Sequence, residues 1–80
     1  MSWYVYILLC ADGTLYTGCT ANVEKRVATH NLGRGAKYTK GRLPVKLVYS
    51  EDMPSKSDAL KREATIKKLS KSEKLKLILH

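Results

Sequence analysis

Several features are scarce or missing in this chain of 80 residues, and each points away from a class of protein. Two cysteines are too few for a disulfide framework, so we expect a reduced, cytoplasmic setting. No apolar run approaches the roughly 20 residues that a helix needs to cross a bilayer, so we expect no membrane partner. The first ten residues, MSWYVYILLC, lack the basic segment and small-residue cleavage site typical of a signal peptide.

Acidic residues are also scarce. Seven Asp and Glu stand against fifteen Lys and Arg, which gives a formal net charge of +8. Such a charge favours a polyanionic partner, either a nucleic acid or an anionic membrane surface. The alternative from charge alone is a basic protein without such a partner.

No internal repeat, low-complexity tract or linker divides the chain, so we expect one domain over 1–80. The hydrophobic pattern predicts an α+β fold: a small three-stranded antiparallel sheet flanked by helices, in the order β-β-α-β-α-α. The first strand is apolar at both parities, so both of its faces should be covered. Strands are expected at 3–10, 14–20 and 44–51, helices at 22–32, 56–69 and after Ser70, and a basic, glycine-rich loop at 33–42.

Serines and a glycine mark helix ends. Ser55 and Ser70 each stand three residues before an acidic residue, which is typical of a capping box. Gly33 is placed to end the helix at 22–32. In the last helix we expect Leu75, Ile78 and Leu79 to share one apolar stripe.

The first hairpin has two possible registers. A two-residue turn at 12–13 would place Tyr6 and Tyr16 on opposite faces, and turn statistics mildly favour it. A three-residue loop at 11–13 would instead pair Tyr6 with Gly18 and place both tyrosines on one face. Gly18 would then leave space opposite Tyr6 for a closely approaching ligand.

Two polar residues fall on or beside the apolar stripe of the helix at 22–32. With Val23 as the origin, Val27, Arg26 and His30 all lie within about 60° of it at 100° per residue. A single inward histidine is most often a satisfied core residue. An inward arginine beside it needs a partner, because an unpaired buried guanidinium is costly.

Glu63 stands out on the helix at 56–69, because its helical neighbours Ala59, Leu60 and Ile66 are all apolar. A carboxylate on a packing face needs a cation, a metal ion or a cluster of donors. The structural alternative is an internal ion pair between Glu63 and Arg26.

These side chains suit phosphodiester hydrolysis. No Ser-His-Asp set, Cys-His pair or glycine-rich phosphate-binding motif is present. A single Glu cannot hold a metal ion alone. Mg²⁺ nevertheless fits, because it keeps several waters and takes one or two carboxylates together with substrate phosphate.

The spacing of these residues resembles the GIY-YIG nuclease family. YVY at 4–6 and YTG at 16–18 stand where the family has its two named triplets. Arg26, His30 and Glu63 stand at the family's arginine, His-or-Tyr and metal-binding glutamate positions. The resemblance covers the whole chain and is strongest to short stand-alone bacterial members, which share PVKLVY and ALKRE…IKKL.

The resemblance implies a metal-dependent endonuclease that cleaves DNA, with repair or recombination as its setting. It implies one Mg²⁺ or Mn²⁺ site on Glu63, a phosphate-binding arginine, and one tyrosine as general base, with Gly18 keeping the pocket open. It also favours the three-residue hairpin loop, which would put the two cysteines on opposite faces and prevent a disulfide. The implied catalytic residues are Tyr6, Tyr16, Arg26, His30 and Glu63.

The loop at 33–42 is the expected contact for nucleic acid. Its cations would take backbone phosphates, and its tyrosine could reach a phosphate or stack on a base. The alternative is an ordinary solvated loop. The residues concerned are Arg34, Lys37, Tyr38, Lys40 and Arg42.

Two departures from the family leave other functions open. Tyr4 replaces the first glycine of the family, and Cys19 stands where excision-repair relatives carry a lysine. A nucleic-acid-binding module without turnover, or a protein-interaction domain of the same fold, are the alternatives. The chain has no room for a second specificity domain, so a protein partner could direct it to its substrate.

Overall fold

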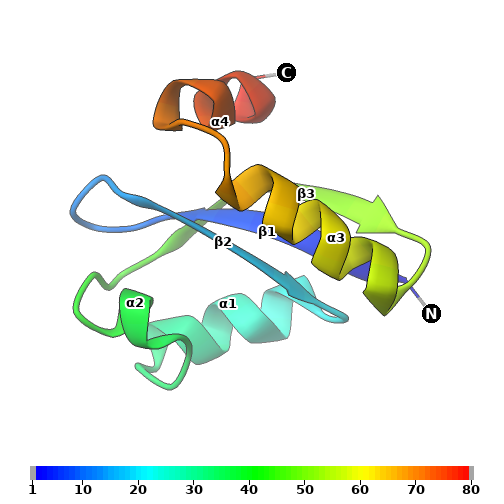
Figure 1. Cartoon of the computed structure of the whole chain (residues 1–80). Coiled ribbons are helices and arrows are strands. Elements are labelled where there is room, and N and C mark those ends of the chain that lie inside the picture. The colour runs from blue at the N-terminus through cyan, green and yellow to red at the C-terminus, as the bar shows by residue number, and fades with distance from the viewer. Residues whose placement is uncertain (1, 80) are drawn as a thin grey trace.

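The computed structural model describes residues 2–79 and confirms the α+β fold with a three-stranded antiparallel sheet (Figure 1). One element was not predicted, a single helical turn within the expected loop at 33–42. The third strand begins and ends two residues later than predicted. The elements are β1 (Trp3–Leu9), β2 (Leu15–Thr20), α1 (Val23–Asn31), α2 (Lys37–Lys40), β3 (Lys46–Met53), α3 (Lys56–Lys67) and α4 (Lys71–Ile78).

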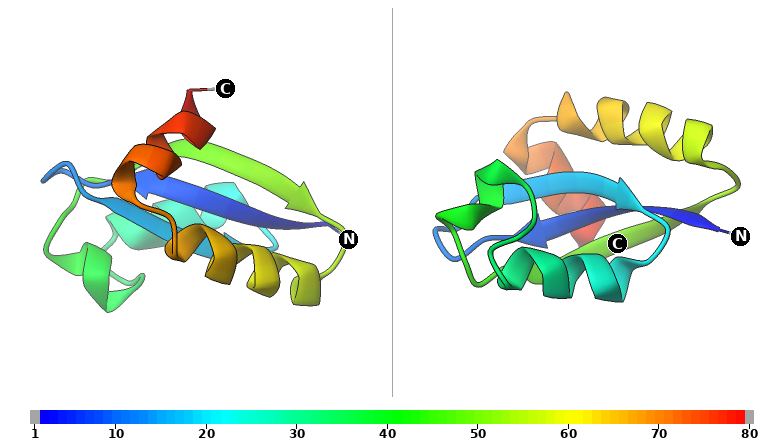
Figure 2. Two further views of the ribbon diagram at one scale, coloured as in Figure 1. Left: turned by 45° about the horizontal axis from the view of Figure 1, so that its top comes forward. Right: turned by 90° about the horizontal axis from the view of Figure 1, so that it is seen from below.

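The sheet has the order β2-β1-β3, so β1 is the central strand. Its side chains alternate between two buried clusters. Val5 and Ile7 pack with residues of α3 and α4, while Tyr6 and Leu8 pack on the opposite face with Val27 of α1. Helices therefore cover both faces, with α3 on one side and α1 on the other (Figure 2). The double-sided burial predicted for the first strand is confirmed.

The hairpin adopts the three-residue loop. Tyr6 pairs with Gly18, and Leu8 pairs with Tyr16. Gly13 has a φ of +86°, a left-handed conformation that favours glycine. This register places Tyr6 and Tyr16 on the same face, as their shared cluster shows.

The two cysteines are free, as predicted. Cys10 belongs to the cluster on the Tyr6 face, and Cys19 packs against the cluster on the Val5 face. The sheet therefore separates the two thiols.

Helix α1 is closed at both ends by local hydrogen bonds. The Asn22 side chain accepts from the Lys25 amide at 3.1 Å. At the other end Gly33, with a φ of +76°, donates to the His30 carbonyl, and Arg34 donates to the Thr29 carbonyl. This pair of bonds is a Schellman motif. It reverses the chain and brings residues 34–36 back beside α1.

The apolar stripe predicted for the last helix is wrong in two of its three residues. Leu75 is 40% exposed and Leu79 is 83% exposed. Leu77 and Ile78 pack against the core instead. The capping box at Ser70 fixes where α4 begins, but its rotation against the sheet depends on tertiary packing. None of the described helices is long and apolar enough to cross a membrane.

Candidate active site

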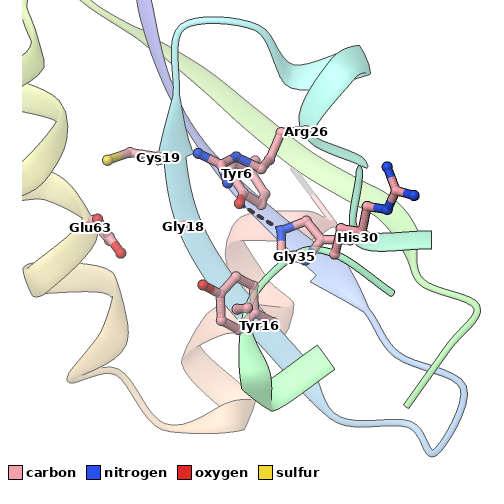
Figure 3. Close-up of a pocket in the computed structure, with 10 residues that line it drawn as sticks. Tyr6, Tyr16, Gly18, Cys19, Arg26, His30, Gly35 and Glu63 are labelled. Atoms are coloured by element: carbon pink, nitrogen blue, oxygen red, sulfur yellow. Dashed lines mark hydrogen bonds between the residues drawn. The ribbon is translucent and has the colours of Figure 1, made fainter. Parts of the chain in front are cut away.

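One open pocket of about 270 Å³ collects every predicted catalytic residue. It lies over the edge strand β2 and is lined from both faces of the sheet (Figure 3). Loop residues 34–36 complete its wall. The predicted residues that line it are Tyr6, Tyr16, Gly18, Arg26, His30 and Glu63.

Gly18 has a different structural role from the one predicted. The space opposite Tyr6 is not free for a ligand, because the Tyr6 ring itself fills it. A Cβ atom on Gly18 would lie 2.5 Å from the Tyr6 hydroxyl oxygen and 2.7 Å from its Cζ. The missing side chain thus lets the tyrosine lie flat across the neighbouring strand.

Tyr6, His30 and Thr39 form a buried chain of hydrogen bonds. The Tyr6 hydroxyl lies 3.1 Å from Nε2 of His30, and Nδ1 of His30 lies 2.9 Å from Oγ1 of Thr39. The three residues are at most 2% exposed. The inward position predicted for His30 is confirmed, and its ring nitrogens are fully engaged.

Burial shifts the pKa values of both titratable residues in this hydrogen-bonded group, Tyr6 and His30. It raises the pKa of Tyr6, and the nearby Tyr16 raises it further. It lowers the pKa of His30, with the charge of Arg26 as a second cause. At neutral pH we therefore expect a protonated phenol beside a neutral imidazole.

Tyr16 lies at the centre of an aromatic group. Its ring centroid is 5.4 Å from that of His30 and 6.5 Å from that of Tyr6, both at tilted angles. Its other neighbour is Tyr38, stacked at 5.8 Å with an interplanar angle of 27°. Tyr16 is half-buried, so it lies closer to solvent than Tyr6.

Arg26 is exposed and lines the pocket. It lies at the edge of the stripe that buries His30, so the Arg26 guanidinium is not buried. Figure 3 shows its guanidinium beside Tyr6. A cation at this position is available to an anion that enters the pocket.

Glu63 enters the pocket from the other face of the sheet. Its side chain is only 16% exposed, and Oε2 lies 2.8 Å from Nζ of Lys67, one turn further along α3. The expected structural alternative, an ion pair with Arg26, is not formed. Cys19 neighbours Glu63, and burial together with this carboxylate raises the pKa of the thiol to about 11.

The donor set fits a hard divalent cation only in part. Within residues 2–79, no group of three or more His, Cys, Asp and Glu side chains is arranged to hold a metal ion. Glu63 alone offers carboxylate oxygens at the pocket. This suits Mg²⁺ or Mn²⁺, which can complete their coordination with water and substrate phosphate.

The basic loop divides into two parts. Arg34, Lys37 and Lys40 are exposed, and Arg34 also lines the pocket. Arg42 is engaged within the protein: Nε lies 3.0 Å from Oδ2 of Asp12, and Nη1 donates to a backbone carbonyl. It is therefore less free than the other three to meet a phosphate.

Tyr38 is 41% exposed. The Arg42 guanidinium carbon lies 4.1 Å from the centroid of its ring, in addition to the stack with Tyr16. Its ring is thus already in contact with two side chains, so a base that stacked on it would have to share or displace one of them.

Two residues of the site were missed in the sequence. Thr39 bonds the buried face of His30, and Gly35 leaves room for the same ring, since a Cβ there would lie 2.7 Å from His30 Cγ. The only sequence signal was that both residues lie in the loop at 33–42, which was predicted to contact nucleic acid because of its cations. Nothing in the pattern indicated that the loop folds back onto the imidazole.

The chain belongs to the GIY-YIG family. A model of the GIY-YIG catalytic domain matches residues 2–76. The predicted resemblance is thereby confirmed, and with it membership in a family of nucleases.

The curated relatives are UPF0213 proteins. One from Syntrophus aciditrophicus is 64% identical over 76 residues, covering 94% of this chain and 87% of the relative. One from Staphylococcus haemolyticus is 61% identical over 75 residues, covering 94% of this chain and 92% of the relative. The chain is thus similar to these proteins over nearly their full length.

Solved structures agree with the fold. The solution NMR structure of a UPF0213 protein from Bacillus halodurans is 47% identical, with a TM-score of 0.61, and covers 98% of this chain and 83% of that one. A solution NMR structure from E. faecalis is 43% identical, with a TM-score of 0.62, and covers 92% and 79%.

Proposed function

We propose that this chain is a single-domain, metal-dependent endonuclease that hydrolyses phosphodiester bonds in DNA. The observation that carries the proposal is the shared pocket. Five side chains from β1, β2, α1 and α3 meet there, although they are spread from Tyr6 to Glu63 along the chain. Only the fold brings them together, and their chemistry suits one reaction.

The side chains divide into three functional groups. Arg26 and Arg34 provide cations for the scissile phosphate, where charge-assisted hydrogen bonds stabilise the developing negative charge. Tyr6, Tyr16 and His30 provide groups that accept and hold protons, as general base catalysis requires. Glu63 would hold Mg²⁺ or Mn²⁺, which supplies positive charge at the leaving oxygen when bound.

Lys67 is paired with one of the two carboxylate oxygens of Glu63, Oε2, and would move away if a cation took that oxygen. Its side chain is 51% exposed, so it can turn into solvent at little cost. Its charge would then be available beside the pocket. A lysine on α3 would thereby supply positive charge near the position where Cys19 replaces the lysine of excision-repair relatives.

DNA would reach the pocket across the basic loop. Lys37 and Lys40 are exposed there, and the formal net charge of +8 would attract the backbone over a longer range. We place this activity in the cytoplasm, in repair or recombination, with a protein partner that directs the nuclease to its site.

A nicking assay tests the proposal. Branched, nicked and plain duplexes should be incubated with the protein, with and without Mg²⁺ or Mn²⁺. We expect metal-dependent cleavage of at least one duplex. Absence of cleavage on all three, under conditions where DNA binding is saturated, would overturn it.

A second candidate is a nucleic-acid-binding module of the same fold without turnover. The observation that favours it is the Glu63–Lys67 ion pair at 2.8 Å, which occupies one oxygen of the carboxylate. Salt-dependent binding of DNA that is insensitive to metal, with no cleavage, would support this candidate over the enzyme.

A further inference from the structure

The direction of each hydrogen bond around His30 can be read from Thr39. The Thr39 hydroxyl donates its single proton to the Ala36 carbonyl at 2.9 Å. It can therefore only accept from Nδ1 of His30, which lies 2.9 Å away. His30 must then carry its proton on Nδ1.

The proton on Nδ1 determines the direction of the hydrogen bond at Nε2, on the other side of the ring. A neutral imidazole protonated on Nδ1 has an acceptor at Nε2. The hydroxyl of Tyr6, 3.1 Å away, then donates to His30 rather than accepting from it. The three bonds run in one direction, from the tyrosine through the ring and the threonine to a backbone carbonyl.

The residues around His30 leave no room for a water molecule to replace Thr39 as the partner of Nδ1. His30 is 1% exposed and Thr39 is 0% exposed. Gly35 packs so closely that even a Cβ atom there would overlap the ring. Water is therefore excluded from the buried side of His30, and Thr39 alone sets which nitrogen is protonated.

We propose that Thr39 is a positioning residue: it holds His30 in the Nδ1–H tautomer, so that Tyr6 can pass its proton to Nε2. In the proposed nuclease the Tyr6 oxygen, which lines the pocket, can then take a proton from the attacking water. The assignment of this role rests on the proposed nuclease function, whereas the tautomer does not.

The proton balance of the step is complete. The water gives one proton to the Tyr6 oxygen as its own oxygen attacks phosphorus, and the Tyr6 proton moves to Nε2. His30 becomes an imidazolium that still donates from Nδ1 to Thr39. The bond from phosphorus to the leaving oxygen breaks, and that oxygen takes a proton from solvent. His30 then returns its extra proton to solvent by way of the Tyr6 hydroxyl, which restores the neutral Nδ1–H ring.

The first test is spectroscopic and needs no enzymatic activity. Long-range proton–nitrogen correlation spectra of ¹⁵N-labelled protein distinguish the two tautomers of a neutral imidazole. His30 and His80 are the only histidines, so a His80→Ala background leaves one ring to assign. We expect the proton on Nδ1, and a ring protonated on Nε2 would overturn the proposal.

The second test uses Thr39→Val, which keeps the shape and removes the acceptor. We expect the ring to switch to the Nε2–H tautomer, because a buried Nδ1–H would have no partner. General base catalysis is worth roughly 10²–10⁴-fold, so partial loss of it should lower kcat by about 10–100-fold. KM should not change, because Thr39 is not exposed to substrate.

Two further variants separate positioning from stability. Thr39→Ser keeps the hydroxyl and should restore kcat to within about threefold of the original. Thr65→Val makes the same chemical change in α3, where the hydroxyl bonds only the Lys61 carbonyl, and should leave tautomer and kcat unchanged.

The outcomes distinguish the two proposals. A Thr39→Val protein that keeps the Nδ1–H tautomer and full kcat would overturn the role of Thr39. A wild-type protein that cleaves no DNA but shows the Nδ1–H ring would overturn the nuclease and leave the tautomer assignment supported.

Discussion

The Glu63→Gln substitution separates catalysis from stability, because the structure predicts a small loss of stability and the proposed function predicts a complete loss of cleavage. Within residues 2–79 the carboxylate forms its ion pair with Lys67, a half-exposed residue one helical turn away. Ion pairs at this i,i+4 helical spacing contribute about 0.3–0.5 kcal/mol, and the half-exposed Lys67 can turn into solvent when the carboxylate is replaced. For 80 residues the unfolding entropy is roughly 0.17 kcal/mol per kelvin, so we expect the Tm to fall by about 3 °C or less.

Cleavage should respond very differently. The amide cannot hold a divalent cation as the carboxylate does, so we expect Mg²⁺-dependent nicking to be lost. DNA binding should be retained, since no cation of the basic loop is changed. The assays are a thermal melt, a nicking assay normalised to folded protein, and a binding titration.

Glu51→Gln is the matched control. Its side chain is 20% exposed, similar to Glu63, but it lies on β3 outside the pocket. It accepts from Arg62 at 2.5 Å and also from the Tyr49 hydroxyl. We expect this variant to lose about 1–2 kcal/mol of stability while its activity per folded molecule stays unchanged.

The opposite pattern would refute the reasoning. If Glu63→Gln cleaved DNA at the original rate per folded molecule, Glu63 would not be a metal ligand for catalysis. A large fall in Tm for this variant, greater than that of the control, would show instead that its carboxylate is a structural partner.

Three more outcomes follow from the site. Gly18→Ala should cost about 1–3 kcal/mol and reduce cleavage, because the new methyl overlaps the buried Tyr6 ring; an unchanged melt would contradict the close packing. Burial lowers the pKa of His30 below 6.5, so the unfolded chain binds more protons and stability should fall as pH drops below about 6.5. Denaturant titrations should show this dependence weakened in His30→Gln, and an equal dependence would contradict it. Lys37→Ala and Lys40→Ala should each lower the salt slope of DNA binding by about 1, unlike a Lys→Ala change in α4.

The sequence predicted those features that depend on local spacing. The register that joins Tyr6 to Gly18 was predicted from the tyrosine pair that the resemblance implies, against the mild preference of turn statistics, and it is confirmed. Helical periodicity correctly placed His30 inward. For His30 the information lies in the spacing of residues along one helix, whereas the hairpin register needed the family resemblance as well.

The features that were missed depend on how elements meet. Thr39 could not be found, because a single turn of helix carries no periodic signal and its docking on α1 is tertiary. The ion-pair partner considered as the structural alternative for Glu63 was Arg26, on another helix, whereas the partner in the structure is Lys67, one turn away on the same helix. The predicted rotation of α4 was wrong for the same reason, because the surface against which a short helix packs determines which of its sides is buried.

The edge strand β2 divides the pocket between two layers of the molecule. Tyr6, His30 and Thr39 belong to the side of α1, while Glu63 belongs to the side of α3. Detachment of α3 would therefore remove Glu63 from the pocket without disturbing the hydrogen bonds around His30. In the proposed nuclease, cleavage would therefore require both helical layers to be docked at once, and the stability of the looser layer would set the temperature at which cleavage stops.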